Sequence, residues 1–324
     1  MMKQYLRLGF GCLLLCTLIA CQSNKLVTSS DNYPLPVPSQ GNIISYHAMP
    51  SHYVAARDVH VWLPNNYAEQ VATGQRFAVL YMHDGQMLFD ANITWNQQEW
   101  GIDEIAQQLM DTQQTRPFIV VGVHNGGDDL RYPEYMPQQP YQSLKDDFKA
   151  NLHKQLSLTH PIQSDAYLAF LVQELKPFID KQFATLADKD NTILGGASMG
   201  GLISWYGVAK YPDVFGGCIC MSTHFIGGGE VTDTTIFEAF TAYMAKSLPV
   251  NGSHRLYFDY GDQTLDQYYP LYHNKLRMFF SQINADPEHV WVKFFPGHDH
   301  TEQAWQTRLA IPLKFTLPTH SKVE

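Results

Sequence analysis

Basic clusters are missing from most of the chain, and this narrows the classes of partner that it can bind. The 324 residues include 22 Lys and Arg against 31 Asp and Glu, for a formal net charge of −9 at pH 7. A nucleic-acid surface needs a basic patch or groove that neutralises phosphates. We therefore expect no nucleic-acid partner.

Cysteine is also scarce, with 5 residues in the chain. Cys218 and Cys220 lie two apart in an apolar, strand-like run, so both thiols would share one strand face. Buried free thiols pack as small hydrophobic groups. We interpret this pair as core, and not as a disulfide, a metal pair or a nucleophile. His-Glu-x-x-His and paired Cys-x-x-Cys motifs are missing too, so we expect no metal and no cofactor.

The N-terminal apolar run, residues 8–20, is short for a transmembrane helix and follows two basic residues, which is typical of a secretory leader. Its last residues, Leu-Ile-Ala followed by Cys21, resemble the lipobox of bacterial lipoproteins. That resemblance implies acylation of Cys21, a membrane anchor and an exported, cell-envelope protein. Gln22 at the next position implies the outer membrane, facing the periplasm or the surface. The alternative is an ordinary leader with a chance cysteine.

The rest of the chain predicts one catalytic domain behind a tether. With residues 1–20 as signal peptide, the polar, proline-rich residues 21–40 predict a flexible segment. Short apolar runs then alternate with helical patterns over residues 41–324. Such repeated strand–helix units predict an α/β fold with a mostly parallel sheet and helices on both faces. One of the helices should begin with Ser164 as N-cap and kink or end near Pro177.

The strongest functional signal is a serine boxed in by glycines. Gly196-x-Ser198-x-Gly200 follows an apolar strand and precedes a helical pattern, which is the order of a nucleophile elbow. In such an elbow the serine takes strained backbone angles, and its neighbours two positions away must lack side chains. A glycine-rich turn is the alternative. We take Ser198 as the candidate nucleophile.

A serine hydroxyl needs a base that takes its proton and an acid that orients the base. In α/β-hydrolases the acid and then the histidine follow the serine along the chain. Asp262 and Asp266 come after one predicted strand, and His298 and His300 come after the last one. Adjacency to the strand end favours Asp262 as the acid. A rival interpretation takes His298-Asp299-His300 as metal ligands of a metallohydrolase.

A second predicted strand, residues 77–82, leads into the turn His83-Asp84-Gly85-Gln86. Open α/β sheets place ligand groups at the carboxyl ends of their strands. We therefore assign an oxyanion donor to the backbone N–H of Gln86. A structural turn is the alternative.

Residues 126–161 contain many glycines and prolines and predict a long loop that caps the site. Asp84, in the preceding turn, and Arg131 and Glu134, within this segment, are candidate substrate-binding residues. The alternative for the segment is a solvated excursion with an Arg131–Glu134 ion pair. Several aromatic residues could line a carbohydrate or aryl pocket, or pack on the core instead: Trp95, Trp100, Tyr132, Tyr135, Tyr268 and Tyr269.

Taken together, the motifs resemble the esterase D-like family of α/β-hydrolases, which includes feruloyl esterases, siderophore esterases, S-formylglutathione hydrolases and mycolyltransferases. The resemblance runs from about residue 43 to residue 317. It is carried by His83-Asp-Gly-Gln86, Arg131-x-x-Glu134-Tyr135-x-Pro137, Gly196-Ala-Ser198-Met-Gly200-Gly201 and His300-x-Glu302-x-x-Trp305.

By position, the resemblance implies that Ser198 is the nucleophile and His300 the general base. It places the oxyanion hole at the N–H groups of Met199 and Gln86. For the acid, it implies Asp266 in preference to Asp262.

The chain departs from these relatives at residues 222–225, where they often carry Ser-Pro and aromatics. Here the third residue of that run is His224. This histidine is either a candidate substrate contact or a loop histidine.

The implied function is hydrolysis of a small carboxylic ester through an acyl-enzyme, with a carbohydrate, feruloyl or siderophore ester as the substrate. An acyltransferase would use the same three residues. A non-catalytic envelope lipoprotein that keeps the hydrolase fold is the remaining alternative.

Overall fold

The structure, a computed structural model, describes residues 34–248 and 254–319. Its centre is an eight-stranded sheet in the order β1-β2-β4-β3-β5-β6-β7-β8. β1 and β2 are antiparallel to their neighbours, and the other strands pair in parallel. The strands are β1 (Asn42–Met49), β2 (Arg57–Leu63), β3 (Ala78–His83), β4 (Phe118–Val123), β5 (Thr192–Ala197), β6 (Gly217–Met221), β7 (Arg255–Tyr260) and β8 (Val290–Phe294).

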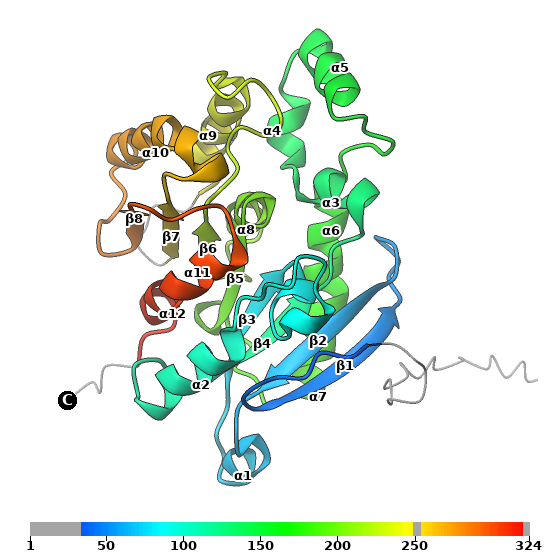
Figure 1. The fold of residues 1–324 in the computed structure, drawn as a ribbon, viewed down its shortest axis with the longest axis vertical. Coiled ribbons are helices and arrows are strands. Elements are labelled where there is room, and N and C mark those ends of the chain that lie inside the picture. The colour runs from blue at the N-terminus through cyan, green and yellow to red at the C-terminus, as the bar shows by residue number, and fades with distance from the viewer. Residues whose placement is uncertain (1–33, 249–253, 320–324) are drawn as a thin grey trace, which may run out of the picture.

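Helices lie on both faces of this sheet, as Figure 1 shows. They are α1 (Tyr67–Ala72), α2 (Ile102–Asp111), α3 (Asp128–Tyr135), α4 (Gln138–Gln142), α5 (Asp146–Gln155), α6 (Ser164–Ala169), α7 (Lys176–Gln182), α8 (Met199–Lys210), α9 (Thr235–Ser247), α10 (Pro270–Gln282), α11 (Glu302–Arg308) and α12 (Ala310–Thr316). The expected α/β fold with a mostly parallel sheet is confirmed.

The core has two layers because successive side chains of a strand point to opposite faces. Val79 and Tyr81 of β3 belong to the layer that includes α6, α8, α9 and α10. Leu80 and Met82 belong to the layer formed with α2, α11 and α12. β3 is therefore buried on both faces, which explains its unbroken apolar sequence.

The helix that precedes β5 differs from the sequence-based expectation at Ser164 and, as to where the helix ends, at Pro177. Ser164 is the first residue of α6 and not its N-cap, and its hydroxyl accepts the Gln138 N–H at 2.9 Å. Pro177 does not end the helix: a π-helical stretch, Phe170–Leu175, precedes it, and α7 continues to Gln182. Proline is tolerated there because the first turn of a helix leaves its N–H groups unpaired.

The expected long loop at residues 126–161 is in fact largely helical. It forms α3, α4 and α5, and in Figure 1 these helices stand beside α6 and α9 at one end of the molecule. Tyr135 and Met136 of this insertion are buried in the main core. Packing of these apolar residues overrides the local preference of proline and glycine for irregular structure.

The N-terminal segment is attached to the domain over its last residues. The Val37 N–H donates to Asp90 at 2.9 Å, and the Ser39 and Gln40 N–H groups donate to Asp103 at 2.7 and 3.1 Å. The expected flexible tether therefore ends before Val37, and not at residue 40. The signal peptide and Cys21 lie outside the described residues. Within the described segments, the structure contains no helix long and apolar enough to cross a membrane.

Candidate active site

Ser198 stands at a sharp strand-to-helix turn, between β5 and α8. Its backbone angles, φ 56° and ψ −124°, lie outside the regions that residues with side chains usually adopt. A Cβ on Gly196 would lie 2.9 Å from the carbonyl carbon of Gly200, so the turn closes only with glycine there. These are the features expected of a nucleophile elbow.

His300 and Asp266 come from different loops and meet beyond the ends of β7 and β8. The His300 Nδ1 lies 2.6 Å from the Asp266 Oδ1. The other carboxylate oxygen accepts the Ser222 hydroxyl at 2.6 Å and the Gly261 N–H at 2.7 Å. Burial alone would raise the pKa of Asp266, but the hydrogen bond and charge of His300, with Ser222 and Gly261, lower it overall. The carboxylate is therefore held ionised against the imidazole.

Asp262 occupies a different position from Asp266. Its Oδ1 accepts the Gly297 N–H and the Gln263 side-chain amide, each at 2.8 Å. Its backbone N–H donates to the His298 carbonyl at 3.0 Å. Asp262 thus holds the histidine loop against the end of β7, while the contact with the His300 ring is made by Asp266.

Ser198 and His300 both border the ring of Tyr269. Burial raises the pKa of Tyr269 and the nearby Ser198 side chain opposes that rise, while the Tyr269 ring meets the His300 ring edge-on at 5.8 Å between centroids. Among the hydrogen bonds of the described residues, none joins the Ser198 hydroxyl to His300. Such bonds are often long in the absence of substrate and tighten in the enzyme–substrate complex.

The two backbone N–H groups assigned to the oxyanion hole belong to Met199 and Gln86. Met199 is the first residue of α8, so its N–H has no partner within the helix and stands at the positive end of the helix dipole. Gln86 lies in a short 3-10 turn, Gly85–Met87, that follows β3. A Cβ on Gly200 would lie 3.5 Å from the Asp84 carboxylate, so this turn packs against the start of α8.

A buried polar network, which no local sequence motif predicts, supports the carboxylate of Asp266. Ser222 accepts the Trp305 indole N–H at 3.0 Å and the Arg308 guanidinium at 2.8 Å. Arg308 also binds Asp259 at 3.1 Å. The pKa of Asp259 is raised by burial, although Arg308 opposes that effect. Because Ser222 donates to Asp266, this network fixes the acid that holds His300.

The expected alternative of an Arg131–Glu134 ion pair is wrong. Arg131 binds Asp84 through two hydrogen bonds of 2.8 Å. Glu134 binds Arg57 at 2.7 and 2.8 Å, with both side chains buried. Burial raises the pKa of Asp84, but the charge and hydrogen bonds of Arg131 lower it overall.

The two ion pairs give the candidate substrate-binding residues Asp84, Arg131 and Glu134 different roles. Glu134 is fully buried and fixes α3 to β2, so it does not reach a substrate. Arg131, by contrast, keeps 32% of its side chain exposed, beside the turn that carries Gln86. One pair therefore anchors the insertion, and the other borders the site.

His224 borders the site and contacts Tyr269. Its N–H donates to the Ser198 carbonyl at 3.2 Å, and its Nδ1 lies 2.9 Å from the Tyr269 hydroxyl. Burial, together with the charges of His300 and Arg131, lowers the pKa of His224 to about 3. A neutral imidazole therefore stands next to the nucleophile at working pH.

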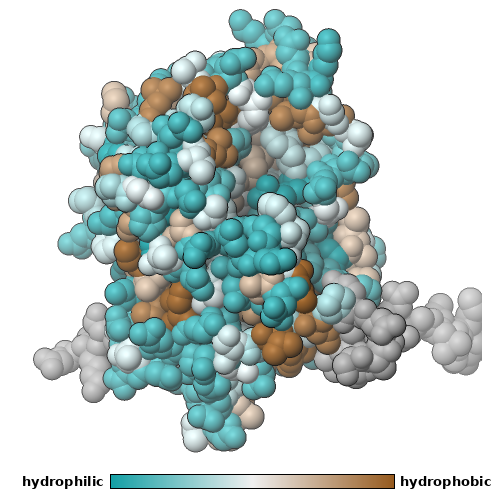
Figure 2. Space-filling view, in the orientation of Figure 1, coloured by the Kyte–Doolittle hydropathy of each residue, from teal (hydrophilic) through white to brown (hydrophobic). Residues whose placement is uncertain are grey.

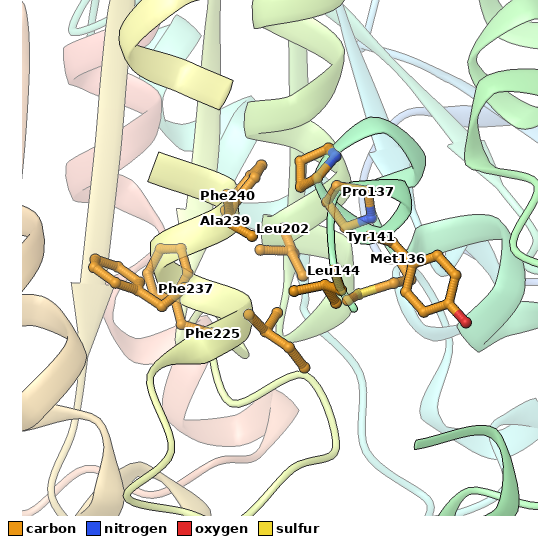
Figure 3. Close-up of a pocket in the computed structure, with 11 residues that line it drawn as sticks. Met136, Pro137, Tyr141, Leu144, Leu202, Phe225, Phe237, Ala239 and Phe240 are labelled. Carbon is orange, nitrogen blue, oxygen red and sulfur yellow. The ribbon is translucent and has the colours of Figure 1, made fainter. Parts of the chain in front are cut away.

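An apolar pocket lies between the insertion and the helices α8 and α9 (Figure 3). Leu202 belongs to the first turns of α8, and Phe225 follows His224, so the pocket begins close to the elbow. Its lining is Met136, Pro137, Pro140, Tyr141, Leu144, Leu202, Phe225, Ile236, Phe237, Ala239 and Phe240. Such a lining suits an uncharged, apolar group.

The rival set of metal ligands is not assembled in the described segments: there, no group of three His, Cys, Asp or Glu side chains is placed to hold a metal ion. Cys218 and Cys220 are buried and unbridged, as expected of core residues.

Comparison with known proteins gives a family match over most of the chain. The family described as "Putative esterase" matches residues 54–315. The chain is 24% identical over 207 residues to the uncharacterized protein YbbA of Bacillus subtilis (strain 168), covering 62% of this chain and 71% of that protein. It is 29% identical over 164 residues to an endo-1,4-beta-xylanase/feruloyl esterase of Xylanibacter ruminicola, covering 48% of this chain and 18% of that protein.

Solved structures of similar fold include an IroE-like serine hydrolase from Shewanella oneidensis, at 17% identity and a TM-score of 0.62, covering 85% of this chain and 79% of that one. The enterobactin esterase FES from Shigella flexneri matches at 16% identity and a TM-score of 0.59, covering 87% and 62%. At such identities the likeness shows the α/β-hydrolase fold.

Proposed function

Because the chain belongs to this esterase family and is a carboxylic ester hydrolase, we propose that Ser198, His300 and Asp266 form its catalytic triad. The observation that carries the proposal is the 2.6 Å contact between His300 and a buried, ionised carboxylate beside the elbow serine. The ionised Asp266 keeps a proton on the His300 Nδ1, which leaves Nε2 free to accept one.

Acylation then proceeds by transfer of a single proton. The Ser198 oxygen attacks the ester carbonyl carbon while its proton passes to the His300 Nε2. The carbonyl oxygen becomes an oxyanion and accepts hydrogen bonds from the N–H groups of Met199 and Gln86. When the bond to the alcohol breaks, His300 gives the proton to the leaving oxygen.

Deacylation repeats these steps with water as the nucleophile. His300 takes a proton from water, the hydroxide attacks the acyl carbon, and the proton returns to the Ser198 oxygen as the acid leaves. Asp266 stabilises the imidazolium in both steps.

The two sides of the substrate would face different surroundings. The apolar pocket under the insertion suits an uncharged acyl group, while Arg131 and the neutral His224 offer polar contacts beside the reacting carbonyl. A feruloyl esterase among the similar proteins makes esters of aromatic acids reasonable first substrates. We propose a small ester of this kind.

The same proposal includes an envelope location. The lipobox-like residues that end at Cys21 support export and a lipid anchor, with the catalytic domain outside the cytoplasm.

The test is labelling by a serine-directed fluorophosphonate, together with turnover of short-chain 4-nitrophenyl esters. Ser198→Ala should lose both signals, whereas a metal chelator should leave both intact. Ser204→Ala is the matched control: its hydroxyl also lies on α8 but binds the Gly200 carbonyl at 2.7 Å, away from the reaction. Turnover by Ser198→Ala equal to that of the parent enzyme would refute the triad.

A further inference from the structure

Trp95 is the most exposed of the large hydrophobic side chains in the described segments, with 84% of its surface open to solvent. The face drawn in Figure 2 is largely hydrophilic, and its hydrophobic residues form small separate groups. Single exposed apolar residues are common and need no explanation by themselves. The position of Trp95 in the fold, however, indicates a function for its exposed ring.

The loop that carries Trp95 is fixed to the element that follows the catalytic histidine. The Asn96 side-chain amide donates to the Glu302 carboxylate at 2.9 Å. The Gln303 N–H donates to the Gln98 side chain at 3.4 Å. Both partners belong to the first turn of α11, directly after the His300 loop.

Contacts between aromatic rings connect the same loop with His300 itself. Trp100, at the end of the loop, packs on Trp305 at 5.2 Å between ring centroids. Trp305 in turn meets the His300 ring at 5.1 Å. Trp100 and Trp305 are almost fully buried. Trp95 is therefore an exposed ring on a well-supported loop, and not the tip of a free one.

The Trp95 loop is also linked to Arg131 through Glu302. Burial lowers the pKa of Arg131, but the carboxylate of Asp84 and, more weakly, that of Glu302 raise it overall. Glu302, which accepts the hydrogen bond from Asn96, is therefore close enough to Arg131 to act on its charge.

The chemistry decides which half of the ester lies near this loop. His300 returns its proton to the leaving alcohol, so the alcohol oxygen must approach the His300 imidazole. The rest of the alcohol then extends on the His300 side, where the Trp95 loop stands.

Resting on the proposed function, we infer that Trp95 is the binding platform for a sugar ring in the alcohol part of the ester. A sugar ring has an apolar C–H face and a rim of hydroxyl groups. Trp95 offers an aromatic ring that is 84% exposed, and the polar side chains of its loop and of the first turn of α11 include Asn96, Gln98 and Glu302. A purely aromatic alcohol would need a second apolar wall, and an anionic one would be repelled by Glu302.

The experiment compares methyl and arabinofuranosyl esters of one acid, made with acetic and with ferulic acid. Trp95→Ala should lower kcat/KM for the arabinosyl ester about tenfold, the order of one lost stacking contact. The loss should appear in KM, and the methyl ester should change by less than about twofold, since it has no ring to stack. Trp95→Phe, which keeps a ring, should lose less.

Tyr53→Ala is the matched control, because Tyr53 is 40% exposed but binds Gln173, in the π-helical stretch Phe170–Leu175 and not in the His300 loop. This variant should hydrolyse both esters as the parent does. Equal losses for both esters in Trp95→Ala would overturn the inference, since they would mean that Trp95 only supports the loop.

A binding measurement separates this inference from the triad. Calorimetry should show that Ser198→Ala binds feruloyl arabinose. The double variant, Ser198→Ala with Trp95→Ala, should bind it about tenfold more weakly. Equal affinity of the two proteins would overturn the platform even if the triad holds. Turnover retained by Ser198→Ala would refute the triad, and the affinity difference would still decide the role of Trp95.

Discussion

Replacing Asp266 by Asn should abolish most of the activity without removing the shape of the site. The carboxylate contacts three donors: the His300 ring at 2.6 Å, the Ser222 hydroxyl at 2.6 Å and the Gly261 N–H at 2.7 Å. An Asn has only one oxygen, and two of these donors face the same carboxylate oxygen. The Asn oxygen should therefore stay with Ser222 and Gly261, and its NH2 should point at His300.

An NH2 group that points at His300 Nδ1 stabilises the wrong tautomer of the imidazole. The His300 Nδ1 must then accept, so the proton moves to Nε2, the atom that has to take the Ser198 proton. Loss of the correct tautomer costs about 10⁴-fold in kcat, or about 5.4 kcal/mol in the barrier. Loss of one charge-assisted hydrogen bond should also lower the free energy of unfolding by about 2 kcal/mol.

The assay is kcat for a 4-nitrophenyl ester, with circular dichroism as a check of folding at the assay temperature. Asp262→Asn is the matched control: it keeps an oxygen for the Gly297 N–H and should retain kcat within about threefold, as changes outside the reacting groups usually do. If Asp262→Asn lost more activity than Asp266→Asn, the assignment of the acid and the tautomer argument would both be refuted.

Three further predictions concern the supports of the site and the N-terminus. Glu134→Gln leaves the Arg57 charge buried without its partner, so urea unfolding should show a loss of about 3–5 kcal/mol, and a change below about 1 kcal/mol would contradict the buried pair. Burial and the neighbouring carboxylates raise the pKa of Glu99 to about 7. Glu99 therefore keeps its proton in the folded state at pH values where the unfolded chain, with a pKa near 4.5, has released it. The free energy of unfolding should fall as the pH rises from about 4.5 through about 7. Glu99→Gln should therefore raise Tm at pH 8 but hardly at pH 4.5, and equal shifts at both would show that charge is not the cause. Cys21→Ser should move the protein from the detergent phase to the aqueous phase in Triton X-114 partition, and retention in detergent would refute the lipid anchor.

Local sequence predicts part of the proposed catalytic site. The elbow at Ser198 depends on glycines within two positions, and a single run of chain carries strand, turn and helix together. The loop after the last strand narrowed the base to His298 or His300, because parallel strands bring such loops to one edge of the sheet, and the family resemblance implied His300. Local sequence left the acid open between two aspartates of one loop. The family resemblance favoured Asp266, and only the fold shows which carboxylate meets the ring.

Where the sequence-based expectations failed, the partners were distant in the chain. The Arg131–Glu134 pair looked reasonable at three residues apart, yet Glu134 binds Arg57, 77 positions away. The prolines and glycines of residues 126–161 predict a loop, because both residue types disfavour regular helices. Burial of Tyr135 and Met136 in the core stabilises helices there instead.

By itself, then, the sequence determined the α/β class and the elbow motif at Ser198, because short-range patterns of apolar residues and glycines fix strands, helices and turns. Tertiary structure alone decided which charges pair, how Ser222 and Arg308 hold the acid, and that Trp95 stands exposed on the side of His300. The physical reason is that hydrogen bonds and burial act between side chains that are close in space, and no local pattern records which distant residues will meet.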